Sequence, residues 1–112
     1  MNKHNKLSKK QYTIHLLRQY FKEYCLHDWS WRLNDRRCGG GVCKYHSKYL
    51  EISRHYISSP NITKKDIHNT ILHELAHIFT QGHGHSEQWR KKFIELGGNG
   101  KIKCKHFSSF IK

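Results

Sequence analysis

The sequence predicts an α+β fold in one small domain, and three observations support this prediction. Apolar residues recur at helical spacing near both ends of the chain, and in the stretch between they alternate with polar residues, as in strands. The length of 112 residues suffices for one hydrophobic core but not for two. We therefore expect a single domain over residues 1–112, with flexible ends at 1–7 and 106–112.

The first expected element is an amphipathic helix from Ser8 to about Leu26, with Ser8 capping its first turn. A small antiparallel sheet of about three strands should follow, because apolar and polar side chains alternate there. The alternating apolar residues are Trp29, Trp31, Leu33, Tyr45, Leu50 and Ile52. The glycines at residues 39–41 predict the first turn of this sheet, and residues 46–48 predict the second.

A longer helix is expected to begin after Thr63, which matches Asp66 in an acidic capping box. Ile62 and Ile67 flank this start in the positions of a hydrophobic staple, and Gly82 is suited to ending the helix. These signals predict the helix from its ends, without reference to any functional motif inside it.

The last expected element is a short helix with Ser86 as its cap. Trp89 and Phe93 share one face of this helix, and the glycine-rich residues 97–100 stop it. The chain shows no internal repeat and no stretch of linker composition, so these elements are expected to share one core.

The chain is strongly basic, with 21 Lys and Arg against 8 Asp and Glu and a formal net charge of +13. Such a surplus attracts polyanions, so nucleic acid is the leading expected partner class, with better solubility as the alternative explanation. The N-terminus lacks the apolar core of an export signal, and no stretch is long and apolar enough to span a bilayer. We expect an intracellular monomer, cytoplasmic or associated with DNA, that is not secreted and has no membrane partner.

Residues 73–77 read His-Glu-Leu-Ala-His and lie inside the longer predicted helix. Histidines four positions apart share one helical face, so His73 and His77 can bind one metal ion, and Glu74 can reach a water held there. Zinc suits imidazole ligands best. The alternative is a chance match in a chain with eleven histidines, which would leave two surface histidines on an amphipathic helix.

A catalytic zinc needs a third protein ligand, and His83 and His85 both follow the helix closely. His83 has the spacing of the metzincin motif, but Thr80 occupies the position of that motif's glycine. His85 directly precedes the predicted cap Ser86, so the following helix would hold its ring rigidly. We therefore favour His85, with His83 as a group outside the ligand set that supports a ligand or faces the substrate.

At this point the sequence resembles the SprT-like family of zinc metallopeptidases, which includes the Spartan-related proteases of DNA–protein crosslinks. The resemblance begins with HELAH and continues in "HSEQW" at residues 85–89. Upstream, "WRLNDRRCGGGVCKYHSKYLEISRHYI" resembles the family's strand region, and downstream "WRKKFIELGGNGK" resembles its closing helix and glycine turn. The similarity covers roughly residues 12–101.

The resemblance implies a minigluzincin-like domain in which His73, His77 and His85 bind one catalytic Zn²⁺. It also implies that Glu74 is the general base of a peptidase that hydrolyses peptide bonds of DNA-associated or DNA-crosslinked proteins, a role in DNA repair. His83, Tyr45 and Tyr56 are candidates for stabilising the oxyanion, although a structural role is favoured for each.

The family's separate zinc ribbon is not recognisable in these 112 residues, so we expect DNA contacts to come from the protease domain itself. The nucleic-acid-binding residues cannot be assigned individually. The basic residues available for this role are Arg32, Arg36, Arg37, Lys44, Lys48, Arg90, Lys91 and Lys92. Trp29 and Trp31 are expected to pack on the core rather than stack on unpaired bases.

The four cysteines are expected to be reduced, since no export signal precedes them. A second, structural metal site built from Cys38, Cys43, Cys104 and His106 is conceivable, but the spacing of these residues does not fit a zinc-finger pattern. A packed thiol is therefore favoured for Cys43. The alternative function is a basic, zinc-stabilised nucleic-acid-binding module without proteolytic activity. Glu74 favours the enzyme, because a structural zinc site needs no base.

Overall fold

The computed structural model describes residues 6–102 and has the α+β architecture that the sequence predicts. Its elements, in chain order, are α1 (Lys9–Glu23), β1 (Ser30–Asn34), β2 (Gly41–Lys44), β3 (Tyr49–Ser53), α2 (Arg54–Ser58), α3 (Lys64–Phe79) and α4 (Glu87–Glu95). Residues 1–5 and 103–112, which include most of the ends expected to be flexible, lie outside the described residues.

Both predicted caps of the long helices are confirmed. The Ser8 hydroxyl accepts a hydrogen bond from the backbone of Gln11 at 3.1 Å, and the Gln11 side chain bonds back to Ser8. Thr63 and Asp66 exchange the same pair of bonds at the start of α3, with Ile62 and Ile67 buried on either side. The start of the motif-bearing helix is therefore fixed by local hydrogen bonds.

The sheet is mixed, which corrects the expectation of antiparallel strands throughout. Its strand order is β1-β3-β2, with β3 antiparallel to β2 but parallel to β1. Residues 35–40 form a connection wide enough to leave a gap between β1 and β2, and β3 returns through the 45–48 turn into that gap. The central place suits β3, because Leu50 and Ile52 are fully buried.

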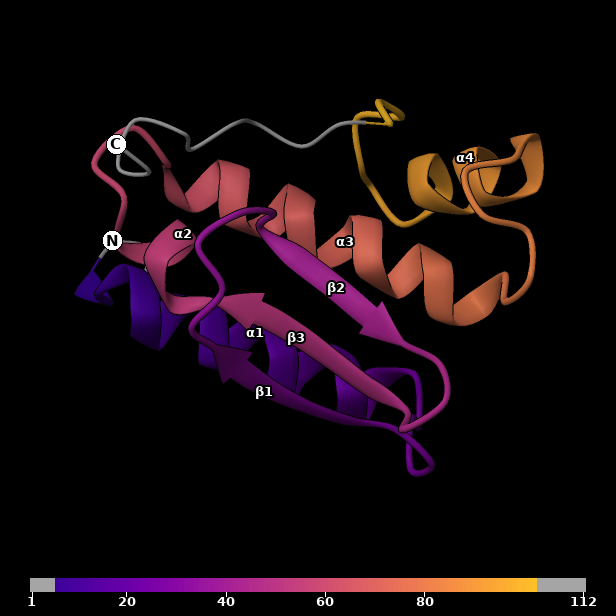
Figure 1. Ribbon diagram of the computed structural model, residues 1–112, viewed down its shortest axis with the longest axis horizontal. Helices are drawn as coiled ribbons and strands as arrows, with labels where there is room; N and C mark the ends of the chain where they lie inside the picture. The colour runs from indigo at the N-terminus through magenta and orange to yellow at the C-terminus, as the bar shows by residue number, and fades with distance from the viewer. Residues whose placement is uncertain (1–5, 103–112) are drawn as a thin grey trace.

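The helices lie on one face of the sheet and leave the other face open (Figure 1). Leu50 and Ile52 face the helices, together with the neighbouring strand residues Trp31 and Leu33. Trp29 is 8% exposed and belongs to the same core. The expectation that Trp29 and Trp31 pack on the core is therefore confirmed.

The short helix α2 follows β3 directly and was not predicted from sequence. Five residues are too few for a helical period to show in the pattern. The Ser53 hydroxyl caps it by accepting from the backbone of Tyr56 at 3.2 Å. None of the helices in residues 6–102 has the length and apolar character that crossing a membrane requires.

Candidate metal centre

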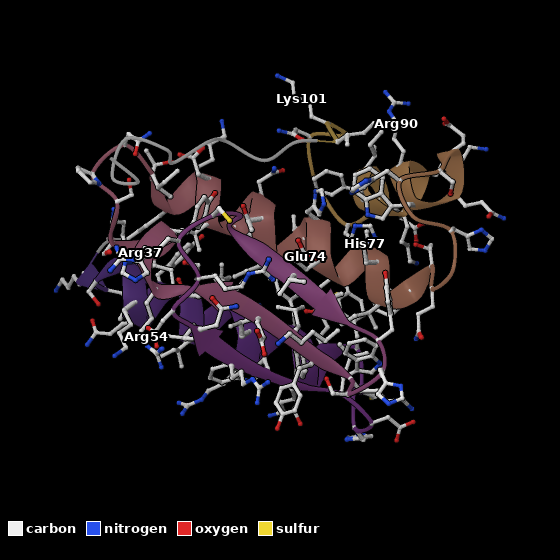
Figure 2. All side chains as sticks on the ribbon, in the orientation of Figure 1. Arg37, Arg54, Glu74, His77, Arg90 and Lys101 are labelled. Atoms are coloured by element: carbon white, nitrogen blue, oxygen red, sulfur yellow. The ribbon has the colours of Figure 1, made fainter. Side chains whose placement is uncertain are left out.

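Helix α3 runs between the sheet and α4, and its buried C-terminal half carries the HELAH motif. His73 and His77 are 6% and 9% exposed, and their four-residue spacing puts both rings on one face. In Figure 2 His77 lies below α4, whereas Glu74 lies beside β2. The motif therefore divides its side chains between the two elements that flank the helix.

The third histidine of the cluster is His85, which is exposed in the loop before α4. Its Nε2 lies 3.2 Å from Nε2 of His77 and 3.3 Å from Nε2 of His73. Zn–N bonds of about 2.0–2.1 Å in a tetrahedral site separate two ligand nitrogens by about 3.3–3.4 Å. These two distances fit one zinc ion, and the ligand atoms of all three histidines lie within 4.8 Å of one another. His83 is not part of the group.

The two buried histidines are held in the form that binds a metal. Burial, followed by the charges of the neighbouring histidines, lowers the pKa of His73 to about 3 and that of His77 to about 4. Both rings are therefore neutral at pH 7, with one nitrogen unprotonated. Their Nδ1 atoms are buried without a hydrogen-bond partner among the described residues. If Nε2 binds a metal, Nδ1 of each ring carries the proton.

Trp89 holds the three histidine rings in place. It is fully buried on α4, and its ring stacks on His77 at a centroid distance of 5.2 Å and meets His73 and His85 edge to face. Its Nε1 donates a hydrogen bond to the backbone oxygen of His73 at 3.2 Å. Sequence reasoning placed Trp89 behind His85 but missed its contact with the other two rings. The available signal was the cap at Ser86, because its hydroxyl accepts from the backbone of Trp89 and so fixes the position of Trp89 in the first turn of α4.

Glu74 is 5% exposed, and its Oε2 lies 3.9 Å from Nε2 of His73, beside the three converging nitrogens. Burial raises the pKa of Glu74 to about 8, although a hydrogen bond from Cys43 acts in the opposite direction. A divalent cation at the histidines would favour the ionised carboxylate. Glu74 can therefore hold or release a proton at neutral pH.

Strand β2 packs directly over Glu74, a contact that sequence reasoning missed. A Cβ atom at Gly41 would lie 2.9 Å from Cγ of Glu74 and 3.2 Å from its Oε2, so only glycine fits without displacement. The Cys43 thiol donates to the backbone oxygen of Glu74 at 3.0 Å. The one available signal was the glycine run, since a glycine in a strand often marks a close approach.

The three candidates for oxyanion stabilisation differ in position. The Tyr45 hydroxyl follows β2 and donates to the backbone oxygen of His77 at 3.4 Å, and burial raises the pKa of Tyr45 to about 12. Tyr56 is fully buried and bonded to the Thr70 hydroxyl at 2.8 Å, so it has a structural role. His83 is exposed in the turn after α3. Tyr45 is therefore a candidate that contacts a residue of the histidine cluster, through the backbone oxygen of His77.

The cysteines of the described residues are free. Cys43 is partly buried against the core, in agreement with the packed thiol expected from the sequence, and burial and the nearby Glu74 raise the pKa of its thiol far above the ordinary value. Cys38 is exposed, and Cys104 and His106 lie outside the described residues. The second metal site, which the sequence does not favour, is therefore untested.

Comparison with known protein families gives a match over most of the chain. The model of the SprT-like family matches residues 9–106, which include every helix and strand described above. No curated protein matches the chain.

Proposed function

The chain belongs to the SprT-like family, and on this premise we propose that it is a zinc-dependent peptidase for proteins associated with or crosslinked to DNA. The family is one of zinc metallopeptidase-like domains. The observation that carries the proposal is the convergence of three histidine Nε2 atoms beside one buried carboxylate. The DNA-linked substrate is the further step, supported by the net charge of +13.

In this proposal His73, His77 and His85 hold the zinc ion, which polarises the peptide carbonyl and acidifies water when bound. The neutral rings of His73 and His77 present unprotonated Nε2 atoms, and Trp89 keeps the ring planes in place. Three protein ligands leave a fourth position open, which is typical of catalytic rather than structural zinc.

Glu74 is proposed as the general base. Its Oε2 takes a proton from the attacking water and delivers that proton to the leaving nitrogen of the cleaved peptide bond. The high pKa of the buried carboxyl suits this double task, because the protonated form is accessible at neutral pH. Gly41 and Cys43 on β2 keep the carboxylate against the helix, where it stays beside Nε2 of His73.

The alternative is a basic nucleic-acid-binding module in which zinc only stabilises the fold. One observation favours it: the cluster links α3 to the loop before α4 and so connects two elements of the core. A purely structural site, however, usually has four protein ligands and no neighbouring base. The described residues offer three ligand histidines and Glu74, so we favour the enzyme.

The experiment compares the zinc-loaded protein with its Glu74→Gln variant on a protein crosslinked to single-stranded DNA and on the same protein without DNA. Because the substitution keeps size and leaves the three histidines in place, both proteins should bind one zinc per chain. Only the protein with Glu74 should cleave the substrate, and it should cleave the DNA-crosslinked substrate faster than the same substrate without DNA. Equal cleavage by both proteins would disprove the role of Glu74, and zinc binding without any cleavage would support the module.

A further inference from the structure

Among residues 6–102, no helix covers one face of the sheet (Figure 1). The strand residues that alternate away from the core define this open face, and the register of the strands places them side by side. They are Ser30, Arg32, Asn34, Val42, Lys44, Tyr49, Glu51 and Ser53. The candidate metal centre does not use any of them.

A buried carboxylate organises the middle of the open face. Glu51 is only 2% exposed although no helix covers it, because its neighbours on β1 and β2 surround it. Its Oε2 accepts from Nε of Arg32 and lies 3.4 Å from Nζ of Lys44, and its Oε1 accepts from Asn34 at 2.9 Å. Two cations thus share one anion, so this group keeps a positive charge.

Arg32 is held in a fixed orientation with its outer nitrogens free. Its guanidinium carbon lies 3.9 Å above the ring of Tyr49, and its Nε is occupied by Glu51. Neither Nη atom has a partner among the described residues, and half of the side chain is exposed. A planar guanidinium immobilised in this way is prepared to donate two parallel hydrogen bonds to an oxyanion.

Further positive charge lies along the direction of the strands. Lys44 ends β2, and Lys48 is exposed in the turn that leads into β3. The backbone of Lys48 is fixed by its oxygen, which accepts from the backbone of Ser30 at 2.9 Å. The only carboxylate among the residues of the open face is the buried Glu51, so an approaching anion meets cations first.

We propose that the open face binds the phosphodiester backbone of single-stranded DNA, with Arg32 donating to a phosphate and Lys44 and Lys48 attracting its neighbours. An extended chain of regularly spaced negative charges fits cations spread along strands, and the net charge of +13 favours a partner of high charge density. This inference rests on the proposal that the substrates are associated with DNA, and it names the surface that would contact that DNA.

The test is a fluorescence-anisotropy titration of the zinc-loaded protein with a short labelled single-stranded oligonucleotide at several salt concentrations. Lys44→Gln/Lys48→Gln is compared with Arg18→Gln/Lys22→Gln, which removes the same charge from exposed positions of α1 on the far side of the sheet (Figure 1). Each lost phosphate contact makes the log–log salt slope shallower by about 0.7, so two lost contacts weaken binding about 25-fold near 0.1 M salt. The α1 variant should lose less than about threefold.

Arg32→Lys is the second variant, since it leaves a cation beside Glu51 and so preserves the sheet while removing the two free nitrogens. It should weaken binding at least about threefold. Equal losses in the two double variants, or wild-type affinity in Arg32→Lys, would overturn the proposal. Equal competition by a polyglutamate peptide would also overturn it, by showing an acidic-protein surface. Binding is read without proteolysis, so failure here is separable from failure of the peptidase.

Discussion

Replacing Gly41 with alanine should disturb Glu74 without disturbing the histidines. The added Cβ would lie 2.9 Å from Cγ of Glu74 and 3.1 Å from Cδ1 of Ile52, closer than a methyl group tolerates. Either the carboxylate or the strand must therefore move by several tenths of an ångström. A misplacement approaching 1 Å lowers the rate of a positioned reaction by about 100-fold, so we expect turnover to fall about 10- to 100-fold.

The stability change can be worked out as well. Inserting a methyl group into a packed site costs about 1–3 kcal/mol, and we take about 2 kcal/mol. An unfolding entropy of about 2.1 cal/mol/K per residue gives about 0.24 kcal/mol/K for 112 residues, so the melting temperature should fall by about 8 °C. Zinc content should stay at one per chain, because the three atoms nearest to a Cβ at Gly41 belong to Glu74 and Ile52 and not to a histidine.

Gly40→Ala is the matched control for this prediction. Its Cβ would lie 3.0 Å from the Tyr56 ring, and the three atoms nearest to it all belong to that ring. This variant should lose stability with little loss of turnover. The assays are thermal unfolding, zinc content and cleavage of a protein substrate at saturation. Wild-type turnover in Gly41→Ala, or an equal loss in Gly40→Ala, would refute the reasoning.

Three further predictions concern other contacts. The hydrogen bonds of Asn34 and Arg32 and the charge of Lys44 outweigh burial and lower the pKa of Glu51, so its stabilisation is present above its unfolded pKa of about 4.3 and is lost as pH falls through the folded value. Glu51→Gln should therefore lower the free energy of unfolding at pH 7 by about 1–2 kcal/mol, as measured by urea denaturation. An equally large difference in unfolding free energy at pH 3 would contradict this. Trp89→Phe removes the donor to the His73 carbonyl and should cost the metal-free protein about 1–2 kcal/mol in urea unfolding, whereas an unchanged midpoint would show that the bond contributes nothing. His85→Ala should lose stoichiometric zinc and His83→Ala should keep it, as measured by metal analysis after dialysis; the reverse result would exchange their roles.

Local signals predicted the three longer helices, α1, α3 and α4, but not the five-residue α2. The caps at Ser8, Thr63 and Ser86 depend on bonds between residues three apart, so the sequence contains both partners of each bond. The geometry of the histidine cluster was predictable for the same reason. Helical spacing aligns His73 with His77, and the cap that follows His85 fixes where the loop turns.

Pairing and contacts between distant segments could not be predicted in this way. Alternation identifies a strand but says nothing about its neighbours, so the insertion of β3 between β1 and β2 was invisible in the pattern. The contact of Gly41 with Glu74 joins residues 33 positions apart. The open-face group around Glu51 likewise depends on the parallel pairing of β1 with β3. These features follow from tertiary packing.

The proposed ligands all come from thirteen consecutive residues, 73–85, and Trp89 follows four positions later. The loop that must close to assemble the centre is therefore short, and the entropy lost in closing a loop rises with its length. Pairing β1 with β3, in contrast, must join Ser30 to Tyr49 with another strand between them in the chain. In kinetic terms the metal centre is able to form before β1 pairs with β3, so zinc supplied during refolding should speed folding as well as retard unfolding.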